Sequence, residues 1–137
     1  DVNILIPFET EAHRPVKATG TSTSDLLHEA DATDASGGTD IYEGLLSALD
    51  ELPSESEASQ YTTAIVLMTD GRSNSDHQDE FESAYKSRGR DLPIFSIMFG
   101  DADPSQLKSL ATLSNAKVFD GRSGDLAAVF RQVKGFN

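Results

Sequence analysis

Two short segments of the chain place oxygen-bearing side chains at positions where ligands commonly bind. In IVLMTDG, residues 65–71, four apolar residues lead directly to Thr69 and then to the carboxylate of Asp70. In SGGTDI, residues 36–41, a Gly-Gly turn precedes Thr39, whose hydroxyl stands just before a predicted helix. Carboxylate and hydroxyl oxygens suit Mg²⁺, Mn²⁺ or Ca²⁺ better than soft metals. The two segments therefore predict a site for a hard cation.

Other acids and the histidines fit this site less well. Asp101 and Asp103 follow another apolar run and could hold a second cation, but the favoured interpretation is that Asp103 caps a helix and Asp101 is solvated. Thr39 could itself be a helix N-cap, as well as a ligand. The remaining candidates have no ligand spacing and are interpreted as surface residues: Asp31, Asp34, His13, His28 and His77.

The elements that must position these residues can be recognised from apolar periodicity and cap signals. Asp40 and Glu43 are spaced as a capping box at the start of one helix, and Ser75 and Gln78 as a capping pair at the start of another. The predicted strands are 2–8, 14–18, 61–69, 92–99 and 117–119, with the first two paired. The predicted helices are 24–32, 40–52, 75–87, one from residue 103, and 124–134.

From residue 61 onward, strands alternate with helices, which indicates a parallel sheet covered by helices. The nearly continuous apolar centre of 61–69 is typical of a strand buried on both faces. In such a sheet, ligands bind outside the carboxyl ends of the strands, where Asp70 stands. The expected fold class is α/β, a Rossmann-like and mostly parallel sheet with helices on both faces.

Composition limits the function classes. A chain of 137 residues fits a single domain over 1–137, and a net charge of −12 argues against nucleic acid or an anionic membrane as partners. The absence of cysteine excludes disulfides, thiol catalysis and zinc-thiolate sites. No apolar run approaches the roughly 20 residues of a membrane-spanning helix. A soluble binding domain or a cation-dependent enzyme remains.

The pair SGGTDI and IVLMTDG, in this order and about thirty residues apart, resembles the von Willebrand factor type A domain. The resemblance extends over nearly the whole chain. It implies a Rossmann-like sheet with a metal-ion-dependent adhesion site, in which Thr39 and Asp70 match two of the ligand positions. In that family the cation, Mg²⁺ or Mn²⁺, usually leaves one position for an acidic residue of a partner protein.

The chain departs from the family pattern at the third part of the site. The family's Asp-x-Ser-x-Ser motif follows a first strand, and neither that motif nor that strand and its helix is found upstream of Val2. Asp34-Ala35-Ser36 is the nearest match, but it lies in a predicted loop. Truncation, completion by another chain, or a rearranged sheet would each account for this. We expect open strand edges, possible self-association through them, and weak metal binding by this chain alone.

An enzyme is the main alternative to a binding module. A Mg²⁺-dependent phosphohydrolase could use Asp70, but phosphatases of the haloacid dehalogenase type need Asp-x-Asp, and Met68 stands at the nucleophile position. No Walker-type phosphate loop and no Gly-x-Ser-x-Gly elbow occurs. A metal-free structural scaffold is the other alternative. The sequence favours a non-enzymatic protein-binding module, with an extracellular or cell-surface location slightly preferred over a cytoplasmic one.

Overall fold

The computed structural model describes residues 2–9, 11–19, 38–70, 72–88, 92–123, 128 and 131–132. The chain divides into two compact units. The first unit comprises residues 1–51 and 74–87, and the second comprises residues 52–73 and 88–137. The expectation of a single domain over 1–137 stays a prediction.

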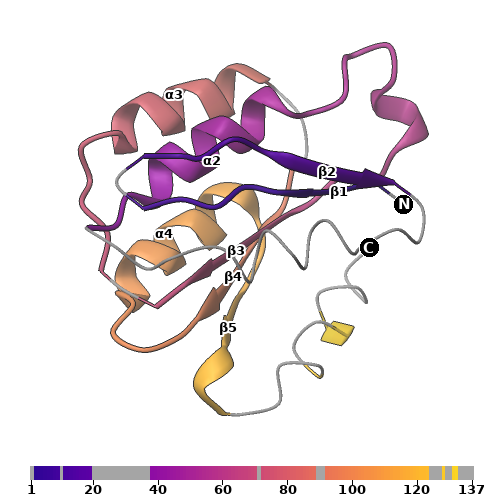
Figure 1. Cartoon of the computed structure of the whole chain (residues 1–137). Helices are drawn as coiled ribbons and strands as arrows, with labels where there is room; N and C mark the ends of the chain where they lie inside the picture. Colours follow the sequence, from indigo (N-terminus) through magenta and orange to yellow (C-terminus); the bar gives the residue numbers. More distant parts are fainter. Residues whose placement is uncertain are drawn as a thin grey trace. The chain divides into compact units, whose positions relative to one another are not determined.

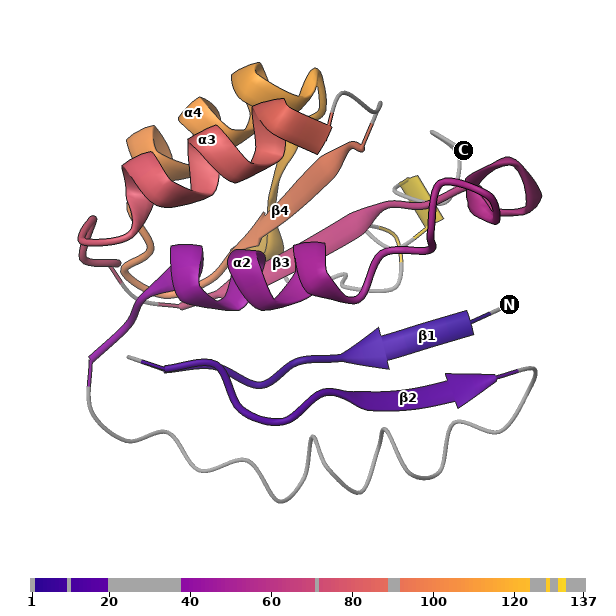
Figure 2. The same ribbon diagram turned by 90° about the horizontal axis from the view of Figure 1, so that it is seen from above.

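The first unit combines a two-stranded antiparallel sheet with two helices. Strand β1 (Val2–Leu5) pairs with β2 (Val16–Thr19), as predicted, and the helices are α2 (Ile41–Asp50) and α3 (Gln78–Arg88). Within this unit α2 lies between the strand pair and α3 (Figure 2). Helix α2 is the helix that the Thr39 segment precedes.

Helix α2 is amphipathic and packs through its apolar side. Ile41, Leu45 and Leu49 recur at helical spacing and are almost completely buried. The ring of Tyr42 lies 6.2 Å from that of Phe81 on α3, measured between centroids. These contacts fix the helix whose first turn adjoins the candidate ligand.

The second unit contains a parallel sheet in the order β3-β4-β5 (Figure 1). Its strands are β3 (Ile65–Thr69), β4 (Ile94–Met98) and β5 (Val118–Asp120), and helix α4 (Pro104–Ser114) packs against β4 and β5. Two short 3₁₀ turns, Ala58–Gln60 and Gly121–Ser123, precede β3 and follow β5. The predicted parallel α/β arrangement is confirmed.

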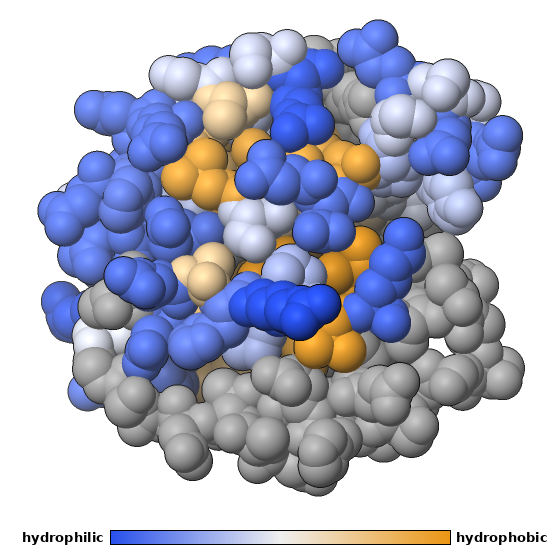
Figure 3. Space-filling model, turned by 45° about the horizontal axis from the view of Figure 1, so that its top comes forward, coloured by the Kyte–Doolittle hydropathy of each residue, from blue (hydrophilic) through white to orange (hydrophobic). Residues whose placement is uncertain are grey.

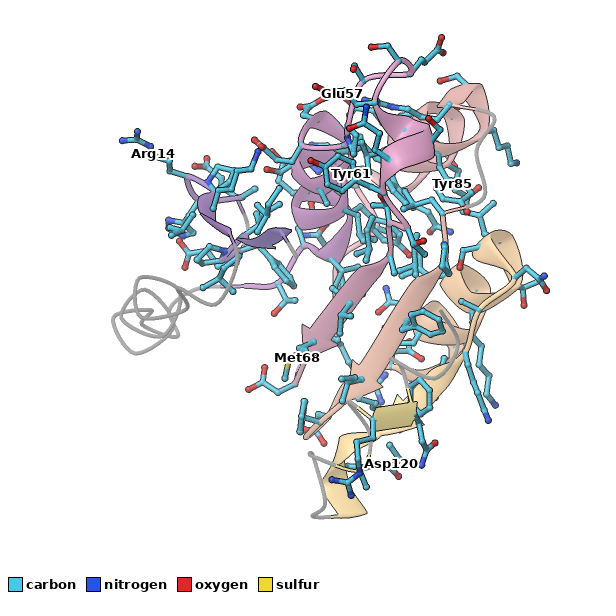
Figure 4. The ribbon with its side chains drawn as sticks, turned by 90° about the vertical axis from the view of Figure 1, so that its right-hand side faces the viewer. Arg14, Glu57, Tyr61, Met68, Tyr85 and Asp120 are labelled. Atoms are coloured by element: carbon cyan, nitrogen blue, oxygen red, sulfur yellow. The ribbon has the colours of Figure 1, made fainter. Side chains whose placement is uncertain are left out.

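The prediction that β3 is buried on both faces is wrong. Every residue of the central strand β4 is buried, whereas the side chains of β3 alternate, with Val66 at 39% and Met68 at 42% exposure. Figure 4 shows Met68 projecting from β3 away from β4. Val66 and Met68 project from one face of the sheet and Leu67 and Thr69 from the other, so at β3 only the second face is covered.

The buried strand β4 carries one polar side chain. Ser96 is completely buried, and within the described residues its hydroxyl has no hydrogen-bond partner. Its neighbours Phe95 and Ile97 project from the opposite face of the strand, where they form an apolar cluster with Phe119.

The cap predictions are confirmed for two helices and wrong for a third. Asp40 caps α2, and Asp103 caps α4 with Pro104 in its first turn, as predicted. Helix α3 begins at Gln78, and Ser75 instead forms a turn in which its carbonyl accepts from the Gln78 amide. The Asn74 side chain bonds to the Asp76 amide, which keeps the chain in a turn and delays the helix.

The described strands form two sheets. No strand among the described residues pairs both with the β1–β2 sheet and with β3. The predicted helix 24–32 lies outside the described residues, and of the predicted helix 124–134 only residues 128, 131 and 132 are described, all helical. The coloured surface in Figure 3 is mainly hydrophilic, as the excess of acids predicts.

Candidate functional site

Thr39 lies immediately before the N-terminus of α2, and its neighbour Asp40 performs the capping. The Asp40 carboxylate accepts hydrogen bonds from the amides of Tyr42 and Glu43 at 3.1 and 3.2 Å. The interpretation of Thr39 as the cap is therefore wrong, because the cap position is taken one residue later. Thr39 is half-buried, and no hydrogen bond to its hydroxyl is found among the described residues.

His77 contacts the capping residue, although the sequence suggested only a surface position. Its Nδ1 donates to the second carboxylate oxygen of Asp40 at 2.6 Å, and the Glu43 carboxylate lies 3.8 Å away. The hydrogen bond to Asp40 is the main cause that raises the pKa of His77 above its ordinary value of 6.5, against partial desolvation. No spacing rule links residues 40 and 77, so this pair leaves no signal in the sequence.

Asp70 lies at the carboxyl end of β3, as predicted, and its side chain is exposed. Its backbone carbonyl accepts a hydrogen bond from the Asp101 amide at 2.9 Å. Within the described part of the chain, no hydrogen bond or ion pair involves the Asp70 carboxylate. The backbone is thus held while the carboxylate is left available.

The loop after β4 determines where the Asp70 segment lies. Gly100 has φ +46°, and a Cβ built on it would stand 2.7 Å from the Asp70 carbonyl oxygen, so a glycine is required there. Gln106 on α4 accepts from the Ser73 amide at 3.2 Å and donates to the Ser73 carbonyl at 2.8 Å. Sequence reasoning missed Gln106, because a contact across 33 residues leaves no local pattern.

The other acids of the second unit have the roles that were favoured. Asp103 accepts from the Ser105 hydroxyl at 2.6 Å and the Ser105 amide at 2.9 Å, and these bonds hold the pKa of Asp103 below its ordinary value. Asp101 is exposed. A second cation at these two residues gains no support from this geometry.

The donor chemistry of the predicted ligands fits a hard cation, but the set is incomplete. Thr39 belongs to the first unit and Asp70 to the second, and their meeting at one ion stays a prediction. Over the described ranges, no group of three or more histidine, cysteine or acidic side chains is placed to hold a metal. Two oxygen donors leave most positions of a six-coordinate ion to water or other ligands.

The candidates that lie outside the described residues are Ser36, Gly37, Asp31, Asp34 and His28.

Comparison with known proteins identifies the family. The family model described as von Willebrand factor type A domain matches residues 5–132. No curated protein and no solved structure gives a match. None of the helices described here is both long and apolar enough to cross a membrane.

Proposed function

The chain belongs to the von Willebrand factor type A family, and from this membership we propose that it is a protein-binding module that engages an acidic residue of its partner through a bound divalent cation. Domains of this family have a Rossmann-like α/β fold and are generally protein-interaction modules, often metal-dependent. Thr39 and Asp70 are the proposed ligands, and Mg²⁺ or Mn²⁺ is the proposed ion. The proposed location is extracellular or at the cell surface.

The observation that carries this proposal is the condition of Asp70. A carboxylate with a structural role usually accepts hydrogen bonds or pairs with a cation, as Asp40 and Asp103 do. The Asp70 backbone is fixed by Asp101, while its carboxylate has no hydrogen-bond or ion-pair partner in the described part of the chain. A held backbone with an uncommitted carboxylate is suited to binding an external ion.

Thr39 supports the same function from the other unit. Because Asp40 caps α2, the Thr39 hydroxyl is not needed for capping. A hydroxyl is neutral and a carboxylate carries one charge, so together they leave a divalent ion with excess positive charge. That excess would attract a partner carboxylate even though the chain itself carries a net charge of −12.

Catalysis is not part of the proposal, because family members are typically non-enzymatic. The residue two before Asp70 is Met68, whose thioether cannot act as the nucleophile of a phosphohydrolase. A generic phosphatase substrate with Mg²⁺ tests the alternative. Hydrolysis of this substrate by the original chain that disappears in Asp70→Asn would show that the chain is an enzyme rather than a binding module.

The proposal is tested by calorimetric titration of Mn²⁺, into the millimolar range, with the whole chain and with Asp70→Ala. We expect binding by the original chain and an affinity loss of about tenfold or more in the variant, equivalent to about 1.4 kcal/mol. Asp101→Ala is the matched control, since it removes an exposed acid from the neighbouring loop. Circular dichroism confirms that each protein is folded. A folded chain without Mn²⁺ binding would contradict the proposal and favour a metal-free scaffold.

A second proposed interaction is self-association through the edge of β3. The Ile65 amide and the Thr69 carbonyl bond to the segments that flank β4. Because backbone groups alternate in direction along a strand, those of Val66 and Met68 face away from β4. The side chains of these two residues are also exposed. The edge thus offers both unpaired backbone groups and apolar surface within the described sheet.

A second copy of the chain fits this edge by symmetry. Two β3 strands related by a two-fold axis at Leu67 would pair antiparallel, with Val66 opposite Met68 of the second copy. Sedimentation should show dimers that increase with salt, since the net charge of −12 opposes association. Met68→Lys should give monomers. Tyr61→Lys, which removes another exposed apolar residue away from β3, should not. Monomers in the original chain at every salt concentration would refute self-association.

A further inference from the structure

The segment 74–77 contacts Thr39 and Asp40, the two residues that immediately precede α2. The Asn74 amide donates to the Thr39 carbonyl at 2.9 Å, and His77 Nδ1 donates to the Asp40 carboxylate at 2.6 Å. All of these residues belong to the first unit. The segment therefore holds residues 39 and 40 from both of its ends.

The segment itself is a compact turn. The Asn74 side chain accepts from the Asp76 amide at 3.2 Å, and the Ser75 carbonyl accepts from the Gln78 amide at 3.1 Å. These local bonds keep the distance between Asn74 and His77 nearly constant. A change at the His77 end is consequently transmitted to the Asn74 end, and from there to Thr39.

Asp40 is the fixed point to which His77 attaches. Its carboxylate is buried and bonded to the first turn of α2, and its amide donates to the Glu9 carbonyl at 2.6 Å. The side chain of His77 is 40% exposed and contributes little to the core. Its ring therefore serves the hydrogen bond more than the packing, and the chain should fold without it.

We infer that His77 is a positioning residue: through its bond to the Asp40 carboxylate it fixes the 74–77 turn, which in turn fixes the backbone that presents Thr39. The consequence for cation affinity rests on the proposed function, whereas the placement of Thr39 does not.

Amide hydrogen exchange at Asn74, followed by NMR, tests the placement without any cation. In His77→Ala, exchange at Asn74 should accelerate by about tenfold or more, because the bond to Thr39 opens locally. In His77→Asn, whose amide nitrogen can replace Nδ1 as the donor, exchange should stay within about threefold of the original chain. His13→Ala is the matched control, since His13 is an exposed histidine of the same unit, 3.5 Å from Glu9.

The result separates positioning from general stability. Unchanged exchange at Asn74 in His77→Ala would overturn the inference, as would failure of His77→Asn to restore protection. An acceleration of the same size at the amides of β4 would also overturn it, because the effect would then be global.

Mn²⁺ titration of the same variants gives the consequence for binding. We expect the affinity to fall about threefold or more in His77→Ala and to recover in His77→Asn. If the original chain binds no Mn²⁺, the proposed function fails, while the exchange measurement still decides the role of His77. If the original chain binds Mn²⁺ and His77→Ala binds it with the same affinity, the position of Thr39 does not affect cation binding. That result would overturn the part of the inference that concerns affinity.

Discussion

The two segments that carry the proposed ligands are held by different kinds of bond. The segment before α2 is held in place by a side chain, because the Asp40 carboxylate bonds to the first helical turn and to His77. The segment after β3 is held in place through its backbone, because Asp101 and Gln106 bond to the main chain of residues 70 and 73. The acid of the first segment is buried and that of the second is exposed.

The difference shows which acid is available to a ligand. Asp40 and Asp70 both stand at the end of a regular element, and their sequence contexts look alike. Asp40 has its oxygens committed to the fold, and Asp70 has its oxygens free in the described structure. Within the described structure, the proposed ligand Asp70 thus differs from Asp40 by the hydrogen bonds that its carboxylate lacks. Removing each kind of support in turn tests this contrast.

The largest effect is expected when the supporting side chain is removed. Asp40→Ala deletes the cap of α2 and the acceptor of His77, and should lower the free energy of unfolding by about 3 kcal/mol. Chemical denaturation measures this. Asp40→Asn retains a capping oxygen and should lose less than half as much. Equal losses in the two variants would show that capping is not what Asp40 contributes.

The next largest effect is expected at Gly100, which supports the Asp70 backbone. Gly100→Ala meets both a positive φ and the Asp70 carbonyl oxygen, and should cost about 2 kcal/mol in unfolding free energy. Gly100→Asn tolerates the positive φ better but still carries a Cβ, so it should lie between glycine and alanine. Thermal unfolding ranks the three proteins. A neutral alanine would mean that the loop does not restrain Asp70.

A smaller effect is expected from Gln106, since two ordinary hydrogen bonds are lost. Gln106→Ala should lower the free energy of unfolding by about 1 kcal/mol and change the NMR shifts of the Ser73 amide. Lys108→Ala, on an exposed position of the same helix, is the matched control. A shift change at Ser73 without any change at β1 and β2 would confirm a local support.

The smallest effect is a dependence of stability on pH that arises from His77. The folded pKa is raised above the unfolded value of 6.5, so the stabilisation is complete below pH 6.5 and is lost as the pH rises through the folded pKa. The groups that face His77 are Asp40 at the N-cap of α2, Glu43 on α2 and Glu80 on α3. Denaturation of the original chain and of His77→Asn from pH 5.5 to 9 measures the difference. A difference that grows with pH would contradict the assignment.

The elements and their order were predictable because they depend on local signals. Apolar runs and caps gave the parallel β3-β4-β5 sheet, the β1–β2 pair and the caps at Asp40 and Asp103. The start of α3 was missed, because an Asn74 side chain competing for a backbone amide looks like any other polar residue. The exposure of Val66 was missed for a different reason: an apolar run does not reveal which face of a strand is covered.

The candidate ligands were chosen by their residue types and stay a prediction, whereas the residues that support them were not predicted. Thr39 and Asp70 stand out because an oxygen donor follows a Gly-Gly turn or an apolar strand. His77 and Gln106 act across long sequence separations, and their partners are chosen by the fold. A single sequence carries no trace of such pairs.

The buried hydroxyl of Ser96 has a consequence for how much change this chain can absorb. A hydroxyl removed from water without a described partner lowers stability, so the core of the second unit is below its optimum. Alanine at this position would raise the melting temperature. In such a background the loops around Asp70 and Gly100 would tolerate more substitutions without loss of folding, including substitutions that test the proposed partner contact.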